Sequence, residues 1–234
     1  METPRVTAVV CAYWPERFDN VELIVRDMLA GTVKPDTLIV LNNNPAYDLS
    51  NRFAEYYQQG VRVLQGWNTE CRGKYVIGLL AFADYYLLND DDITVGPRTL
   101  EYLTANAHRD IVTANRGIAM HNDSFFEGTI VDHDSIDIQQ FVDSICGCSA
   151  FMSHSALVRT IALEEKIRHK WPTEGDDIIA GLANKGNVVV FPMKDDYAWR
   201  WLDTGGVAMN SAPDYYDMRD SFTRDVLAAL EQDG

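Results

Sequence analysis

The sequence contains no apolar run long enough to cross a lipid bilayer. A membrane-spanning helix needs about 20 consecutive apolar residues, and every apolar run in this 234-residue chain is far shorter. After Met1–Arg5 the first apolar run is too short for the central part of a signal peptide, and no small-residue cleavage site follows. We therefore expect no membrane span and a protein that stays where it is made, in the cytoplasm.

Cysteine is scarce, and the cysteines present form no recognisable framework. The four are Cys11, Cys71, Cys146 and Cys148. Cys146 and Cys148 are separated by one residue, which is too close for ordinary bridging, and no second pair completes a zinc-binding pattern. We expect reduced cysteines in or near the core, as is usual in the cytoplasm.

Basic residues are in deficit, with 20 Lys and Arg against 35 Asp and Glu, and the formal net charge is −15. The basic residues are dispersed and form no basic run. A strongly negative protein repels phosphate backbones. General binding of nucleic acid is therefore disfavoured.

The chain also lacks a linker rich in Ser, Pro or Gly, an internal repeat and a low-complexity segment. Hydrophobic residues make up 47% of the sequence, which is enough for one well-packed core. We predict a single domain over residues 1–234, composed of two halves at 1–95 and 96–234.

The first half alternates apolar runs of strand length with helical segments. The expected strands are 5–13, 37–41, 61–64 and 85–88, and the expected helices are 20–30, 50–58 and 69–83. Asn20, Ser50 and Thr69 are placed to begin these helices. Such alternation favours a mainly parallel sheet with helices on both faces. Ligands of such sheets bind beyond the carboxyl ends of the strands, where this chain has the loops 13–19 and 89–92.

The second half is less regular. The expected helices are 96–107, 176–183 and 221–230, and the expected strands are 111–113, 125–131, 145–152 and 188–191. With the first half, they predict an α/β fold, a single Rossmann-like domain whose mixed, mainly parallel central sheet is flanked by helices.

The acidic triplet Asp90-Asp91-Asp92 directly follows the apolar strand 85–88. Three carboxylates at the mouth of a buried strand repel one another and lose hydration unless a cation shares them. In an extended link Asp90 and Asp92 lie on the same side, so one can reach a metal while the other reaches a ribose or a metal-bound water. Oxygen ligands select Mg²⁺ or Mn²⁺ over zinc. The alternative is a solvated acidic loop, which the position after a buried strand disfavours.

A second acidic cluster, Glu174-Gly175-Asp176-Asp177, opens the helix expected at 176. The helix dipole favours carboxylates at a helix start, so capping alone explains this cluster when it is considered in isolation. Considered with the triplet, it supplies the second carboxylate that glycosyl transfer needs.

In their order, these motifs resemble those of exostosin-like glycosyltransferases, a GT-A family that transfers N-acetylhexosamine with retention of configuration. The resemblance covers about residues 5–195, and its landmarks are Tyr13–Arg17, Val40-Leu41-Asn42-Asn43, Asn68 with Arg72, Leu87–Asp92, Asn115-Arg116, Ile145–Phe151 and Gly175-Asp176-Asp177-Ile178. The acidic triplet stands where GT-A enzymes carry their DxD motif. Ordinary family-2 transferases, which are mostly inverting, share most of these landmarks.

The resemblance implies a GT-A fold with a nucleotide-binding half at 1–95 and an acceptor-side half with a C-terminal helix at 96–234. It implies Mn²⁺ or Mg²⁺ as the cofactor and a nucleotide-diphosphate sugar, in particular a UDP-sugar, as the donor. Asp92 is the expected direct metal ligand, and Asp90 a second ligand or a contact to the ribose or a metal-bound water. Asp177 is the expected catalytic carboxylate, with Asp176 beside it.

A set of residues in the first half is expected to bind the donor nucleotide. These residues are Tyr13, Arg17, Asn43, Asn68, Arg72, Asp90 and Asp91. Tyr13 and Trp14 can stack on a uracil-like base, and Arg72 can pair with a phosphate or a base edge. Packing at the strand end is the alternative for the two aromatic residues.

The acceptor side is less defined. Trp199, Arg200 and Trp201 are expected to form a wall there, with core packing an equal alternative for the two tryptophans. His121 and His133 lie near this region, and we expect them to be hydrogen-bonded or exposed rather than functional.

The sequence leaves the acceptor and the stereochemistry open. The acceptor is a saccharide, a lipid-linked sugar, a protein or a hydroxymethylated base of DNA, and the transferred sugar is a hexose or an N-acetylhexosamine. Two other classes share part of the pattern. A nucleotidyltransferase usually carries a Gly-rich basic loop where this chain has Tyr13–Arg17, and a non-catalytic sugar- or Ca²⁺-binding module would bind no nucleotide sugar.

Overall fold

The computed structural model describes residues 4–66, 68–69, 72–171, 175–204 and 214–231, without the side chains of residues 176 and 216. At its centre is an eight-stranded sheet in the order β3-β2-β1-β4-β11-β6-β12-β9. These strands are β3 (Val61–Gln65), β2 (Thr37–Asn42), β1 (Val6–Ala12), β4 (Tyr85–Asn89), β11 (Ser149–Ser153), β6 (Val112–Ala114), β12 (Val188–Val190) and β9 (Gln140–Val142).

Most neighbouring strands of the sheet run parallel. β3, β2, β1 and β4 form a continuous parallel block, and β12 is parallel to β6. β11 runs antiparallel to both β4 and β6, and β9 is antiparallel to β12. The sheet is therefore mixed and mainly parallel, as the alternation of strands and helices in the first half predicts.

Strand β1 is buried on both faces. Its even-numbered residues from Val6 to Ala12 belong to one apolar cluster, whereas Val9 and Cys11 belong to the cluster on the opposite face. A strand covered on both sides is apolar along its whole length rather than at alternate positions. This explains why the run 5–13 is recognisable as a strand in the sequence.

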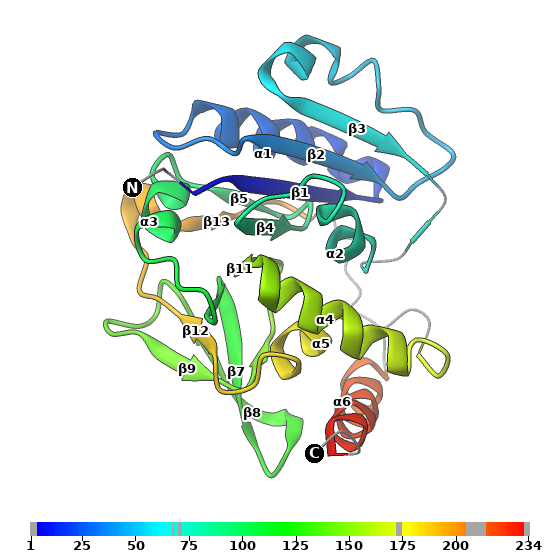
Figure 1. The fold of residues 1–234 in the computed structure, drawn as a ribbon, viewed down its shortest axis with the longest axis vertical. Helices are drawn as coiled ribbons and strands as arrows, with labels where there is room; N and C mark the ends of the chain where they lie inside the picture. The colour runs from blue at the N-terminus through cyan, green and yellow to red at the C-terminus, as the bar shows by residue number, and fades with distance from the viewer. Residues whose placement is uncertain (1–3, 67, 70–71, 172–174, 205–213, 232–234) are drawn as a thin grey trace.

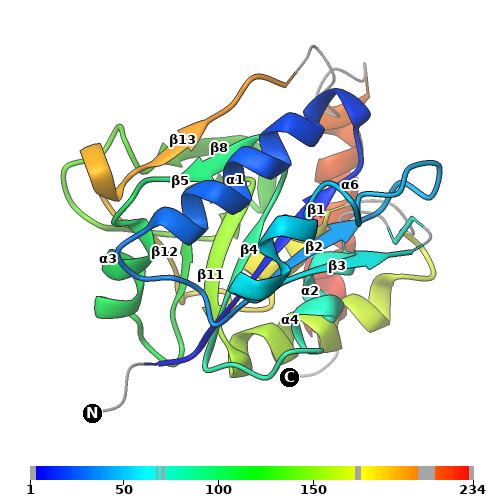
Figure 2. The same cartoon turned by 90° about the horizontal axis from the view of Figure 1, so that it is seen from above.

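One face of the sheet is covered by α1, α3 and a two-stranded ribbon of β5 and β13 (Figures 1 and 2). The elements are α1 (Phe18–Ala30), α3 (Thr99–Ala105), β5 (Ile93–Val95) and β13 (Trp199–Trp201). The ribbon joins the residues that directly follow the acidic triplet to a strand more than 100 residues later in the chain.

The opposite face is covered by α2 (Gly73–Gly78) and α4 (His154–Ile167). A third apolar cluster joins α4 to α5 (Asp176–Leu182), α6 (Tyr215–Glu231), β7 (Arg116–His121) and β8 (Ser124–Asp132). Figure 1 shows this group beside the β11 and β12 side of the sheet. Among the described helices, none combines the length and the apolar character needed to cross a membrane.

Several expected helices have different bounds. α1 begins at Phe18 after a 3-10 turn that starts at Pro15, so Asn20 does not cap it and instead donates to the Asp203 carbonyl at 2.7 Å. The expected helix 50–58 is a 3-10 helix, Ala54–Gln59. The expected helix 69–83 is reduced to α2, because the turn after Gly78 is closed by tighter i to i+3 hydrogen bonds.

Helix α4 is not among the elements expected from the sequence. Ser153, the last residue of β11, caps it and accepts a hydrogen bond from the Ala156 amide at 3.2 Å. The helix therefore begins without a loop, directly after a strand. The sequence therefore has no turn residues to mark the start of the helix.

Helix α5 packs unusually close to the short strand β10 (Ser144–Ile145). A Cβ atom on Gly181 of α5 would lie 2.5 Å from the Ile145 nitrogen and 2.6 Å from the Ser144 Cα. These neighbours are backbone atoms that cannot rotate away. Glycine is required here, and the close approach places the start of α5 beside the loop that follows β10.

We expect Gly181→Ala to destabilise the protein by about 1–3 kcal/mol, because overpacking against backbone costs more than alanine gains as a helix former. The measurement is the free energy of unfolding in urea. Gly66→Ala is the control, since no atom lies within 4 Å of a Cβ at Gly66. An equal or higher stability of Gly181→Ala would contradict the described packing of α5.

Candidate active site

The acidic triplet occupies the turn between β4 and β5, at the carboxyl end of β4. Two backbone hydrogen bonds fix the turn: the Asp90 amide donates to the Cys148 carbonyl at 2.7 Å, and the Leu202 amide donates to the Asp92 carbonyl at 2.8 Å. The buried side-chain amide of Asn89 donates to two carbonyls of the same turn. The triplet therefore lies on a rigid edge of the sheet, where open α/β sheets bind ligands.

The middle carboxylate, Asp91, points into the protein toward Arg17. The buried Arg17 Nη1 lies 2.7 Å from Asp91 Oδ1 and 3.2 Å from Asp92 Oδ2. Burial raises the pKa of Asp91, although Arg17 acts in the opposite direction. Asp91 and Arg17 thus form an internal ion pair that orients Asp92. A contact of either residue with a nucleotide stays a prediction.

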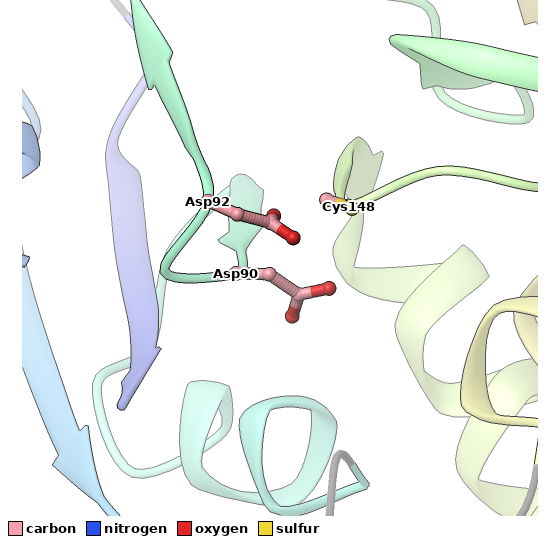
Figure 3. A group of neighbouring side chains, drawn as sticks. All are labelled: Asp90, Asp92 and Cys148. Atoms are coloured by element: carbon pink, nitrogen blue, oxygen red, sulfur yellow. The ribbon is translucent and has the colours of Figure 1, made fainter. Parts of the chain in front are cut away.

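Among the described side chains, Asp90, Asp92 and Cys148 form a group able to hold a metal ion. One ligand atom of each lies within 4.8 Å of the others, and Figure 3 shows both carboxylates directed toward Cys148. Among the described residues, Asp92 Oδ1 is buried without a hydrogen-bond partner, which costs free energy unless a donor or a cation satisfies it. Two carboxylates suit Mg²⁺ or Mn²⁺, so the residues fit a divalent cation.

Lys74 belongs to the same site, and the sequence analysis does not identify it. Its buried ammonium lies 2.6 Å from Asp90 Oδ1. The signal available in the sequence is a lysine followed by the apolar run Tyr75–Ile77, because a charge in an apolar helix needs a partner. The identity of that partner depends on how α2 packs beside β4.

Asp177 lies at the start of α5, as predicted, and is ion-paired with Arg219 of α6. Arg219 Nη2 lies 2.6 and 2.7 Å from the two carboxylate oxygens, and the Ile178 amide donates to Asp177 Oδ1 at 2.9 Å. Arg219 is buried, with its guanidinium 4.5 Å from the Phe125 ring centroid. This partner favours the ionised form of Asp177. The side chain of Asp176 lies outside the described residues.

The loop Cys146-Gly147-Cys148 links the two acidic groups. Burial and the carboxylates of the triplet raise the pKa of the Cys148 thiol. Burial and the nearby Asp177 raise the pKa of Cys146 to about 11. Both thiols are therefore protonated at neutral pH, and two acidic clusters far apart in the sequence border one three-residue loop.

Other residues predicted to bind the nucleotide of the sugar donor surround the carboxyl ends of β1 and β2. Tyr13 is partly exposed, and its amide nitrogen lies 3.4 Å from Asp91 Oδ2. Asn43 is buried and accepts a hydrogen bond from the Thr69 hydroxyl at 2.7 Å. Asn68 is exposed. Nucleotide binding by these residues stays a prediction.

Arg72 takes part in helix packing. It is buried, its Nη1 lies 3.5 Å from Glu164 of α4, and its Nη2 donates to the Trp171 carbonyl. These contacts join the start of α2 to α4 and the residues that follow α4. The predicted contact of Arg72 with the nucleotide is untested, and it would require the guanidinium to leave this buried pair.

The predicted acceptor-side wall is divided between the core and the surface. Trp199 is buried, with its ring edge-on to His133 at 5.6 Å. Trp201 is 40% exposed and pairs with the first residue of β5, directly after Asp92. The Arg116 guanidinium lies 4.5 Å from the Trp201 ring centroid. An exposed Trp201, with the half-buried Arg116 over its ring, therefore borders the triplet.

His133 is buried among hydrogen-bond acceptors. Its Nδ1 faces the Asn115 carbonyl at 3.0 Å and the Asp132 carboxylate at 2.9 Å, and its Nε2 faces the Trp199 carbonyl at 3.1 Å. All three partners only accept hydrogen bonds, so both ring nitrogens carry protons. Burial lowers the pKa of His133, but the hydrogen bond to Asp132 outweighs burial and raises it.

The contact with His133 also changes the pKa of the Asp132 carboxyl. Burial raises the pKa of Asp132, but hydrogen bonds from His133 and Arg116 outweigh it and lower the pKa to about 2. The stability contributed by Asp132 is present above pH ~4, the pKa of an unperturbed carboxyl, and is lost as the pH falls toward about 2. The contribution of His133 is present below pH ~6.5 and is lost as the pH rises through its folded-state pKa.

We therefore expect Asp132→Asn to flatten the dependence of the unfolding free energy on pH, both below pH ~4, where Asp132 titrates, and above pH ~6.5, where His133 titrates. Asp134→Asn, which changes an exposed carboxylate two residues from Asp132, is the control and should keep the wild-type shape. Urea denaturation between pH 2.5 and 8 measures the effect. A wild-type profile in Asp132→Asn would show that the buried pair does not control the titration.

No protein-family model matches the chain, and no curated protein matches it. Solved structures do match its fold. One of them is the structure of S. aureus TarS, residues 1–349, in complex with UDP-GlcNAc, with a TM-score of 0.62 and 14% sequence identity. The match covers 97% of this chain and 66% of that chain, so this chain spans just under two thirds of the TarS structure.

At this level of identity the likeness establishes the fold. It confirms the predicted fold class, a glycosyltransferase Rossmann-like fold with a large, mainly parallel central sheet flanked by helices. The exostosin-like assignment within the GT-A type stays a prediction. This chain thus has the GT-A-like fold that its motifs predict.

Proposed function

We propose that this chain is a metal-dependent glycosyltransferase that moves a sugar from a UDP-sugar to a hydroxyl acceptor. One observation carries the proposal: Asp90 and Asp92 converge at the carboxyl end of β4, where a buried oxygen of Asp92 has no hydrogen-bond partner within the part of the chain that the structure describes. The fold it shares with TarS, whose structure contains UDP-GlcNAc, supports a nucleotide sugar as the donor.

The charge that develops on the departing diphosphate is the main electrostatic demand of such a reaction. A divalent cation held by Asp90 and Asp92 supplies Lewis-acid stabilisation of that charge. Arg17 orients Asp92 from the interior of the protein. Lys74 places a further positive charge beside Asp90, in a protein whose overall charge would otherwise repel the donor.

Asp177 is the proposed catalytic carboxylate, with Asp176 beside it. The ion pair with Arg219 favours the ionised form of Asp177. An ionised carboxylate takes the proton of the acceptor hydroxyl in an inverting reaction. In a retaining reaction it acts as the nucleophile or stabilises the oxocarbenium-like transition state. The resemblance to exostosin-like enzymes favours retention.

The Arg116–Trp201 pair is proposed to contact the acceptor. Trp201 presents an exposed aromatic surface next to the triplet, and Arg116 is held over its ring by an ion pair with Asp132. An aromatic face suits the apolar side of a sugar ring, and a guanidinium suits its oxygen atoms. We therefore favour a saccharide acceptor, free or lipid-linked, over a protein or a modified DNA base.

Two other functions use part of this site. A non-catalytic module would use the carboxylates to bind Ca²⁺ or a sugar without turnover, and a nucleotidyltransferase would release pyrophosphate from a nucleoside triphosphate. Calorimetric titration with UDP-sugars, with and without Mn²⁺, separates the three functions. Mn²⁺-dependent binding of a UDP-sugar supports the glycosyltransferase, and failure of every nucleotide sugar to bind would overturn it.

We expect Asp92→Asn to lower turnover by at least ~10²-fold, because it removes a main electrostatic stabiliser of the leaving group. EDTA should abolish wild-type activity, and added Mn²⁺ should restore it. The control is Asp134→Asn, which changes an exposed carboxylate and should leave turnover unchanged. Full activity in EDTA would refute metal dependence.

We expect Asp177→Asn to leave UDP-sugar affinity within about threefold while lowering kcat sharply, because its role is in the transition state. Asp217→Asn, at an exposed position of α6, is the control. Thermal unfolding must accompany the assay, since Arg219 loses its charged partner. If a folded Asp177→Asn protein loses donor binding but retains kcat, Asp177 is a binding residue and not the catalytic carboxylate.

A further inference from the structure

We propose that Cys148 is the third protein ligand of the divalent cation, and that its sulfur makes the site prefer Mn²⁺ and softer metals over Mg²⁺. This inference rests on the metal site of the proposed function and goes beyond it. The oxygen-only ligand set expected from the sequence does not include a thiol. The structure adds one because the loop before β11 crosses directly opposite the acidic triplet.

The three ligand atoms are close enough for one cation to reach all of them. A metal bonds carboxylate oxygen at about 2.1 Å and sulfur at about 2.3 Å, so two ligands can lie up to roughly 4.4 Å apart across it. The Asp90, Asp92 and Cys148 atoms lie within 4.8 Å of one another. Both carboxylates are already directed toward Cys148 (Figure 3).

The backbone holds the sulfur in this position. The Cys148 carbonyl accepts a hydrogen bond from the Asp90 amide at 2.7 Å, and the next residue, Ser149, is paired with Asn89 in the sheet. Asn115 Oδ1 accepts from the Ser149 amide at 2.9 Å and lies so close to Gly147 that a Cβ there would clash with it. The loop cannot withdraw from the triplet without breaking these contacts.

The orientation of Asp92 points to the same conclusion. Arg17 contacts Asp92 Oδ2, whereas Oδ1 is buried with no hydrogen-bond partner of normal geometry among the described residues. The Cys148 thiol is the group that faces this carboxylate, and a buried oxygen in this state is satisfied by a donor or a cation. A cation between the carboxylates of Asp90 and Asp92 and the Cys148 sulfur has one sulfur and two oxygen ligands.

Sulfur coordination has a defined chemical consequence. When the metal–sulfur bond forms, the S–H bond breaks and its proton leaves to solvent, with no change in oxidation state. Thiolate is a soft ligand that Mg²⁺ binds poorly, whereas Mn²⁺, Co²⁺, Zn²⁺ and Cd²⁺ accept it increasingly well. Replacing the sulfur by oxygen should therefore change which metals bind, and not only how tightly they bind.

The direct test is titration of the metal-free protein with Co²⁺, followed by near-ultraviolet absorption. A thiolate-to-cobalt charge-transfer band is expected in the wild type and lost in Cys148→Ser. Cys146→Ser, two residues away in the same loop, and Cys11→Ser, in strand β1, are controls that should keep the band. A band that persists in Cys148→Ser, or is lost in a control variant instead, would overturn the assignment.

The second readout is metal preference, measured by calorimetry with Mn²⁺ and Mg²⁺. In Cys148→Ser the ratio of Mn²⁺ to Mg²⁺ affinity should fall by ~10-fold or more, in line with the usual cost of altering a metal site. An unchanged ratio would refute a sulfur ligand. If the wild-type protein binds Co²⁺ without showing the band, Cys148 is not a ligand, but the metal site itself is not refuted. Failure of every metal to bind, with UDP-sugar binding intact, refutes the metal site itself.

Discussion

The charge of the acidic triplet is the constraint on which the candidate site depends. Three carboxylates at the end of a buried strand repel one another and lose hydration. The fold therefore brings Arg17 from the turn after β1 and Lys74 from the start of α2 into contact with them. These two charges do not balance three carboxylates, and no described residue supplies a hydrogen-bond partner for one oxygen of Asp92. A divalent cation matches both features.

The rest of the site follows from the elements that enclose the triplet. Strand β13 fixes the turn from one side and presents Trp201 beside it. The loop before β11 fixes it from another side through Cys148 and continues to Cys146, which is close to Asp177. Gly181 allows α5 to approach this loop closely enough to place Asp177 there. The loop before β11 thus holds the proposed metal ligands and the proposed catalytic carboxylate in fixed positions relative to each other.

Positive charge is scarce in this protein, and several of its buried basic side chains lie near the candidate site. Among the described residues, the buried basic side chains are Arg17, Arg72, Lys74 and Arg219. In a chain of net charge −15, three of these charges are paired with acidic residues of the site: Arg17 with Asp91, Lys74 with Asp90 and Arg219 with Asp177. In the proposed function, a divalent cation at Asp90 and Asp92 would supply the further positive charge that an anionic donor requires.

The sequence by itself determined those elements and motifs that can be recognised from a short stretch of neighbouring residues. Buried parallel strands such as β1 and β4 are continuous apolar runs, and the triplet and the Asp176-Asp177 pair stand directly at element ends. The sequence did not reveal α4, because it begins without a loop, nor the roles of Lys74 and Cys148. A partner such as Arg17 for Asp91, 74 positions away, leaves no periodic pattern, since it depends on which strands and helices become neighbours. Only the tertiary structure decided these contacts, because charge neutralisation acts through space and not along the chain.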